Sequence, residues 1–242
     1  MKKILSIIAV CLLSMQVAFA LDDPQFGIDL GAGIVTNFGS SQDMLSLKPG
    51  FADLSIKPNF GWRLGFEASW GFKAIGNPGP VQAGPRWVLQ AGFSTRGYHY
   101  KVSGFKESLH TFDFQVAPFL FGWHFNFRGG EIGLRPHTGP YVSLDFAGLN
   151  KTKYDDEDFG NEESKTSIWE KEIYNEKGDE KRPHQFFDVG WQEGVDVYLL
   201  DQHLYLGIMV QEGFMQMVKK DFRGGNSAGT HFGFMARVGY RF

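Results

Sequence analysis

The sequence predicts an all-β protein, an eight-stranded antiparallel transmembrane β-barrel that follows a cleaved signal peptide. Three observations predict this fold class. Apolar and polar residues alternate along eight segments, as in strands with one face toward lipid and one toward a lumen. The connections alternate between long polar segments and shorter turns. The N-terminus carries the pattern of a secretory signal.

The first 20 residues are expected to be a signal peptide. Lys2 and Lys3 precede an apolar run at residues 4–13, and Ala18-Phe19-Ala20 forms a small-x-small cleavage site. The run is shorter than the roughly 20 residues of a spanning helix. Cys11, the chain's one cysteine, lies within it. Residues 21–242 are then expected to form one barrel domain without disulfides, as suits an oxidising envelope.

The alternation places eight strands along the chain. Residues 60–72 show it most clearly, because aromatic and aliphatic side chains occupy every second position, with Gly, Arg, Glu and Ser between them. The expected strands cover residues 26–38, 60–72, 87–100, 112–127, 132–146, 187–199, 204–210 and 231–242. Two irregularities stand out. The alternation changes phase past Pro118, which predicts a β-bulge. Glu193 falls on the outward face, where we expect a bulge, an interfacial depth or a neighbouring contact.

The connections predict the orientation. Residues 39–59 form a polar loop, and residues 149–184, rich in mixed charge and poor in apolar residues, are expected to be the longest external loop. At the other end lie a Gly- and Pro-rich turn at residues 73–85 and short turns at residues 128–130 and 200–203. Long loops outside and short turns inside are typical of outer-membrane barrels.

The inward positions carry charges of both signs. The arginines are Arg63, Arg86, Arg96, Arg135, Arg237 and Arg241, and the carboxylates are Asp29, Glu67, Asp113, Asp145, Asp188 and Asp196. Eight strands enclose an interior just wide enough to be filled by side chains. Six charges of each sign therefore predict a lumenal charge network that plugs the barrel, because unpaired charges are costly where water is scarce. A narrow pore for small solutes is the alternative, and it requires that these charges do not pair.

Other functions find little support in the sequence. His137, Ser143 and Asp145 share one strand, but His137 and Ser143 lie roughly 20 Å apart at about 3.4 Å per residue, so we expect no enzyme. The acidic residues 155–158 could offer carboxylate oxygens to Ca²⁺, but they lack the spacing of an EF-hand, which favours a solvated loop. The seven histidines show no metal-ligand spacing. We therefore expect no cofactor and no metal. A formal net charge of −3 argues against nucleic acid as a partner.

The last strand supplies a resemblance. Phe232, Phe234, Ala236, Val238, Tyr240 and Phe242 form one face of residues 231–242. This stretch resembles the terminal strand of bacterial outer-membrane barrels, which implies that Tyr240 and Phe242 act as the signal read by the barrel-insertion machinery. The resemblance also implies contact with outer-membrane lipid and lipopolysaccharide.

Motifs along the chain resemble one family in particular. They are residues 26–33 (FGIDLGAG), 90–97 (QAGFSTRG), 112–118 (FDFQVAP), 139–141 (GPY) and 239–242 (GYRF). Their order is similar to that of the outer-membrane β-barrel domain common in Bacteroidetes, often labelled PorT-like and grouped with small porin-family barrels. The resemblance covers nearly all of residues 21–242. It implies a non-enzymatic protein whose external loops carry a structural or binding function, with an envelope protein as a candidate partner.

Overall fold

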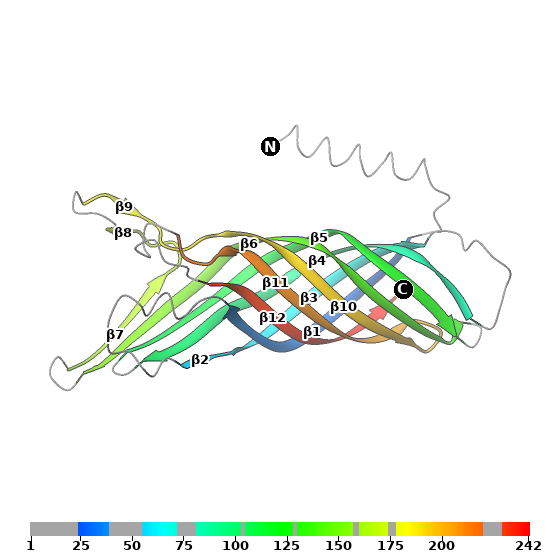
Figure 1. Ribbon diagram of the computed structural model, residues 1–242, viewed down its shortest axis with the longest axis horizontal. Coiled ribbons are helices and arrows are strands. Elements are labelled where there is room, and N and C mark those ends of the chain that lie inside the picture. Colours follow the sequence, from blue (N-terminus) through cyan, green and yellow to red (C-terminus); the bar gives the residue numbers. More distant parts are fainter. Residues whose placement is uncertain are drawn as a thin grey trace.

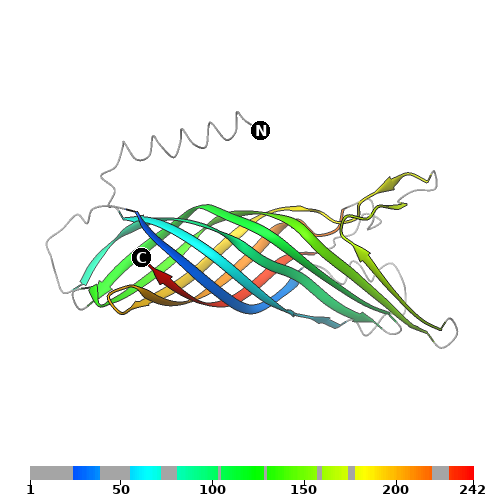
Figure 2. The same cartoon turned by 180° about the vertical axis from the view of Figure 1, so that it is seen from behind.

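The computed structural model describes residues 24–38, 55–71, 81–102, 105–127, 130–156, 160–173, 178–219 and 229–242. Eight antiparallel strands close into a barrel, in the order β10-β11-β12-β1-β3-β4-β5-β6, with β6 pairing back to β10. They are β1 (Gln25–Phe38), β3 (Asn59–Gly71), β4 (Val81–Val102), β5 (Phe105–Phe127), β6 (Ile132–Asp156), β10 (Phe187–Leu199), β11 (Leu204–Gln216) and β12 (Thr230–Arg241). The predicted fold class is confirmed. Figures 1 and 2 show the tilted strands from opposite sides, with the C-terminus at one end and the longest strand extensions at the other.

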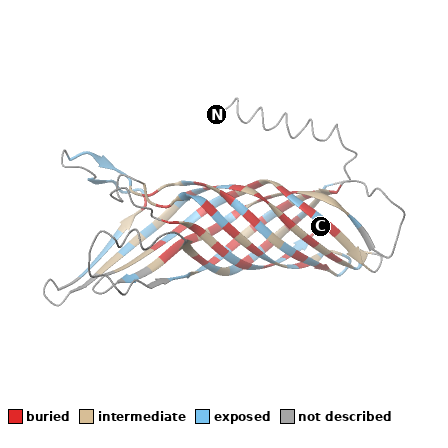
Figure 3. Ribbon diagram, in the orientation of Figure 1, coloured by how far each residue is buried: buried red, intermediate tan, exposed pale blue. Residues whose placement is uncertain are grey.

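The two faces of each strand differ as the alternation predicts. In β3 every second residue from Gly61 to Gly71 is buried, and Figure 3 shows the same alternation around the barrel. Glycines make room inside for large side chains. A Cβ on Gly239 would lie 2.2 Å from the Tyr205 ring, and one on Gly190 would lie 2.5 Å from the Tyr141 ring. Small inward residues therefore let the interior fill with aromatic and charged side chains.

The predicted bulge near Pro118 is present. Asp113, Gln115 and Ala117 are buried before it, whereas Leu120, Gly122 and His124 are buried after it. The β5–β6 pairing shifts register between Val116 and Phe121, and the β4–β5 pairing shifts at residues 88–90. Proline has no N–H to give to a β-ladder, so it is tolerated where the pairing is interrupted.

The prediction that residues 149–184 form one long loop is wrong. β6 continues to Asp156 and pairs with β7 (Gly160–Ser167), while β8 (Glu172–Ile173) and β9 (Glu180–Lys181) form a small hairpin. Nearly all the charged side chains described here are exposed, and the β8–β9 hairpin projects beyond the barrel (Figure 1). The apolar-polar alternation that marks the other strands is therefore missing, although backbone pairing remains.

Two shorter segments also differ from the prediction. β4 begins at Val81, so residues 81–85 of the expected turn belong to a strand. Pro85 fits there because the β3–β4 pairing ends at Arg86, so the missing N–H interrupts no ladder on that side. Within the expected loop at residues 39–59, β2 (Ser55–Lys57) pairs with β4. Residues 1–20, predicted to be a signal peptide, and residues 157–158 of the acidic cluster lie outside the described residues.

The barrel exterior is apolar over its whole circumference. Exposed side chains on it include Phe26, Leu30, Ile34, Phe60, Phe66, Phe93, Phe114, Phe121, Trp123, Leu144, Trp191, Val195, Leu206, Ile208, Phe234 and Val238. So large a continuous apolar surface is unusual for a water-soluble monomer. Glu193 lies within it without a bulge in β10, and its Oε1 lies 3.5 Å from the Thr138 hydroxyl. Among the described residues, no helix has the length and apolarity to cross a membrane.

Candidate functional site in the barrel interior

All twelve charged residues predicted to line the lumen lie on the inner face of the barrel. Eleven of them are buried, and Arg86 is half-buried near one end. They come from β1, β3, β4, β5, β6, β10 and β12, so strands far apart in the sequence contribute to one interior. Their pairing follows the position of each residue along the barrel axis.

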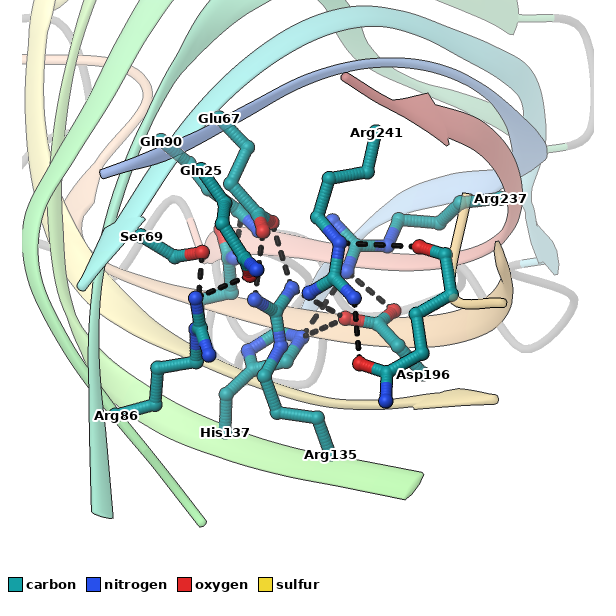
Figure 4. Close-up of polar contacts among 12 residues, drawn as sticks. Gln25, Glu67, Ser69, Arg86, Gln90, Arg135, His137, Asp196, Arg237 and Arg241 are labelled. Carbon is teal, nitrogen blue, oxygen red and sulfur yellow. Dashed lines mark hydrogen bonds and ion pairs between the residues drawn. The ribbon is translucent and has the colours of Figure 1, made fainter. Parts of the chain in front are cut away.

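The middle of the barrel holds a compact charge cluster around Arg135. Its guanidinium donates to Glu67 at 2.6 and 2.7 Å and to Asp196 at 2.9 Å. Arg237 donates to the other oxygen of Asp196 at 2.5 Å, and His137 Nε2 lies 3.4 Å from Asp196. Figure 4 shows these side chains converging from opposite walls. Each carboxylate is therefore compensated where water is scarce.

A second group of ion pairs lies closer to β7 and the external end. Arg96 lies 3.4 Å from Asp113 and 3.1 Å from Asp188, and Arg63 lies 3.5 Å from Asp29. The Ser94 hydroxyl donates to Asp113 Oδ1 at 2.8 Å, so a neutral donor adds to the ion pair on this carboxylate.

A chain of glutamines joins the two groups of charges, and the sequence interpretation did not assign it a role. Gln192 donates to Gln90 at 2.8 Å and accepts from Gln211 at 2.9 Å and from Gln115 at 3.3 Å. Gln90 in turn donates to Glu67 at 3.0 Å. The inward positions of these residues were readable from the alternation. Their mutual contacts depend on the register and shear of four strands, which the sequence does not display.

Apolar side chains pack together toward the β7 end of the barrel, the external end in the topology that the connections predict. Tyr98, Leu109, Ile168 and Met217 form a buried cluster with Phe186 packed against it, which we call the outer cap. Beside it, His184 Nε2 lies 2.6 Å from Asp145. Asp145 is thus paired with a histidine from the predicted loop, not with one of the six arginines.

Exposed charges at the external rim pair differently. Glu163 Oε1 lies 3.0 Å from Nζ of Lys151 on β6 and 3.4 Å from Nζ of Lys165 on its own strand, β7. Hydrogen bonds from these two lysines hold the pKa of Glu163 below its ordinary value. Nearby, the Trp169 ring stacks on Phe186 at 4.3 Å, and the Arg182 guanidinium lies over the Trp169 ring.

At the opposite end, the paired pattern stops. In the described part of the chain, neither Arg86 nor Arg241 forms an ion pair with a carboxylate. Arg86 donates to Ser69 at 3.1 Å and to Gln25, and Arg241 donates to the Gln202 backbone and side chain at 3.0 and 2.6 Å. A pocket of about 470 Å³ adjoins both arginines. The expectation of a fully paired set of six and six does not hold at this end.

The two residues expected to form the insertion signal lie on the outer surface at the same end. Tyr240 and Phe242 are both exposed, and their rings meet edge to face at 5.5 Å. Tyr240 also stacks on His203 at 5.7 Å. This end carries the short turn at residues 200–203 and the C-terminus, which makes it the periplasmic end in the topology that the connections predict.

Comparison with known proteins gives structural matches alone. No protein-family model matches the chain, and no curated protein matches its sequence. The fold is similar to Ail, the attachment invasion locus protein of Yersinia pestis, at 13% identity and a TM-score of 0.36, covering 90% of this chain and 97% of Ail. It is also similar to Neisserial surface protein A, at 12% identity and a TM-score of 0.37, covering 92% and 99%.

A third match is the N-terminal β-barrel domain of Pseudomonas aeruginosa OprF, at 13% identity and a TM-score of 0.26, covering 91% of this chain and all of that domain. Identities and TM-scores this low carry no argument, so the assignment of this chain to a class of membrane protein rests on its own structure. In lipid every backbone polar group needs an internal partner, which a closed barrel provides. The closed sheet, the apolar exterior and the polar interior make this chain an integral membrane β-barrel of the bacterial outer-membrane type.

Proposed function

We propose that the barrel is a non-enzymatic outer-membrane protein with a plugged lumen, and that its binding or structural function resides in the external extensions. The observation that carries this proposal is the Arg135 cluster, in which two arginines compensate Glu67 and Asp196 inside a glycine-lined interior. Fixed pairs of this kind leave no free charge in the middle of the barrel to select a passing ion. The outer cap adds an apolar barrier between these pairs and the external solution.

The external extensions offer the surface for a partner. β6 and β7 project beyond the barrel with alternating lysines and carboxylates, and β8 and β9 add a second exposed hairpin. An envelope protein is the partner that we propose. Replacing residues 150–166 by a short Gly-Asn turn removes the projection and keeps Ile168 in the outer cap. The proposal predicts lost binding to the cell-surface partner with unchanged barrel stability, and it fails if every surface interaction of the cell persists.

Lipopolysaccharide is the proposed lipid-side ligand of the rim. Arg182 lies over Trp169, and Lys219 lies over the Phe186 ring at 5.8 Å, so cations sit next to aromatic rings where a lipid phosphate would meet the barrel. An Arg182→Gln, Lys219→Gln variant should bind lipopolysaccharide micelles more weakly than a Lys151→Gln, Lys165→Gln variant, which loses the same number of cations. Equal binding by both variants would contradict the proposal that Arg182 and Lys219 bind lipopolysaccharide.

The narrow pore remains the second candidate, because the pocket beside Arg86 and Arg241 opens part of the interior. The two functions differ in conductance. A plugged barrel reconstituted in a planar bilayer stays closed, whereas a pore shows stable openings whose selectivity follows the unpaired arginines.

We also propose that the chain belongs to the PorT-like barrels and that Tyr240 and Phe242 act during insertion. Both rings face outward, where an insertion complex can reach them. Phe242→Ser should lower the amount of barrel in the outer membrane of cells, while spontaneous refolding into vesicles stays nearly unchanged. A matched Phe234→Ser change on the same face separates loss of the signal from loss of lipid-facing area.

A further inference from the structure

The periplasmic end of the interior contains two guanidiniums in an environment unlike that of the other lumenal arginines. Arg63, Arg96, Arg135 and Arg237 each lie within 3.5 Å of a carboxylate. Arg86 and Arg241 have amide, hydroxyl and carbonyl partners instead, and both line the pocket of about 470 Å³. Two cations beside one cavity repel each other unless an anion lies between or near them.

Each of these arginines retains a nitrogen without a partner. Nη1 of Arg241 is buried and makes no hydrogen bond, and the residue as a whole is only 4% exposed. Arg86 uses Nε and Nη2 for Ser69 and Gln25, and within the described residues its Nη1 has no hydrogen-bond partner. A guanidinium carries five N–H donors in a fixed fork that suits carboxylate and phosphate oxygens. Each of the two arginines that line the cavity thus keeps one donor unused, and that of Arg241 is enclosed by the surrounding protein.

The turn at residues 200–203 fixes the position of Arg241. Leu200, Asp201 and Gln202 have φ angles of 52°, 54° and 68°, a left-handed backbone that costs about 1–2 kcal/mol per residue outside glycine. Gln202 accepts from Arg241 and donates to Asn126 and to the Gly130 carbonyl at 2.7 and 2.9 Å. Strain of this kind persists where the surroundings hold it in place, and such sites are often functional.

An aromatic ring completes the support. The Arg241 guanidinium lies 4.3 Å from the Tyr198 ring centroid, so one face of the cation is occupied by a π system and its edge remains for hydrogen bonds. The cation is therefore pre-organised before any ligand arrives, which lowers the entropy cost of binding. Asp201, exposed at the pocket, is the side-chain carboxylate among the residues that line it, and it opposes an anion.

We propose that Arg86 and Arg241 form an oxyanion-binding site at the periplasmic mouth of the barrel, for a ligand of the phosphate class. The phosphate is supplied either by a soluble anion of the periplasm or by the headgroup of an inner-leaflet phospholipid. The site is separate from the external extensions, so it adds a periplasm-facing role to a protein whose proposed partner binds at the opposite end. It does not require the lumen to conduct.

The test uses the full barrel refolded in alkyl maltoside micelles, which contain no phosphate. Inorganic phosphate is titrated while the Nε–Hε signals of the arginines are followed by NMR. The proposal predicts saturable shifts of Arg86 and Arg241, and an affinity that falls about tenfold in Arg86→Gln, as expected when one charge-assisted hydrogen bond of about 1.4 kcal/mol is lost. Asp201→Asn should bind more tightly than the wild type.

A second arm identifies the source. Mixed micelles that contain phosphatidylglycerol are compared with the inorganic phosphate titration. Shifts of the same two arginines with lipid alone assign the headgroup, and shifts with inorganic phosphate assign a soluble anion. Arg182→Gln, on the external rim, serves as the control for general charge effects, and Arg241→Lys keeps the charge if Arg241→Gln refolds poorly. Absence of saturable shifts in both arms, or equal shifts in the Arg86→Gln variant, overturns the proposal.

Discussion

The middle of the barrel and its periplasmic mouth contain the same residue type in two different electrostatic situations. Around Arg135, every guanidinium faces a carboxylate at 2.5–2.9 Å. Arg86 and Arg241, at the mouth, are held by neutral groups beside an open pocket. Arg86 is half-buried, so solvent partly replaces a counter-charge. Arg241 is buried, but the Tyr198 ring and two hydrogen bonds to Gln202 surround its guanidinium. The position along the axis, more than residue identity, decides which charges pair with a carboxylate.

Arg135→Ala is the substitution for which this contrast predicts the largest loss of stability. The substitution leaves Glu67 with no cation in contact and leaves Asp196 with Arg237 alone. Breaking a buried pair typically costs about 3–5 kcal/mol, because a charge remains buried without compensation. Urea-induced unfolding of the barrel in lipid vesicles should show this loss. A Glu67→Gln change added to Arg135→Ala should recover part of it, and a loss below about 1 kcal/mol for Arg135→Ala would show that water already reaches the cluster.

The outer cap provides a second comparison, between an apolar closure and the polar mouth. Ile168 is 4% exposed and packs with Tyr98, Leu109 and Met217. Ile168→Ala should destabilise the barrel by about 2 kcal/mol, at the lower end of the range for large-to-small core changes, because the cap lies near the external rim and can partly collapse. The same unfolding assay measures the change. Ile173→Ala, at a residue of β8 that is 68% exposed, should have no effect.

A substitution at the periplasmic mouth should change the unfolding free energy less. Arg86→Gln removes two hydrogen bonds, to Ser69 and Gln25, but it also removes repulsion between Arg86 and Arg241. The net change in unfolding free energy should be at most about 1 kcal/mol, the usual value of a hydrogen bond. A loss as large as that of Arg135→Ala would mean that the mouth is as dry as the middle, and the contrast would be wrong.

The smallest effect concerns an exposed ion pair. The pKa of Glu163 lies below its ordinary value of 4.5 because Lys151 and Lys165 donate to it. A lowered folded-state pKa means that the contribution is present above pH 4.5 and is lost as the pH falls through the folded value. The protection factors of the β7 amides, which compare their exchange with that of an unfolded chain at the same pH, should therefore fall below about pH 4.5, and Glu163→Gln should abolish this pH dependence. An unchanged pH profile in the variant would assign the effect to other groups.

The alternation of residue types predicted much of this fold. It located all eight barrel strands, the phase change past Pro118 and the outward position of Glu193, because one face of each strand meets lipid and the other a packed lumen. It failed at residues 149–167, where β6 and β7 pair outside the membrane with charges on both faces. Hydrogen bonding of the backbone sustains that hairpin, and this leaves little trace in hydropathy.

The interior was predictable by position but not by partner. Inward facing follows from strand parity, so all twelve charged residues were identified. Their pairing depends on strand tilt and register, which bring Arg135 of β6 to Glu67 of β3 across the lumen. His184 was missed as the partner of Asp145 because it was assigned to a loop. To predict that Arg86 and Arg241 lack a carboxylate partner, one must know where they lie along the barrel axis, and residue spacing alone does not give this position.

The most direct test of the plugged lumen is the single-channel conductance of the refolded barrel in a planar bilayer, with Arg135→Ala measured beside it. The account predicts a silent wild type, because paired charges and the outer cap close the interior, and intermittent openings in the variant. Stable, ion-selective openings of the wild type would contradict it and make the lumen a pore.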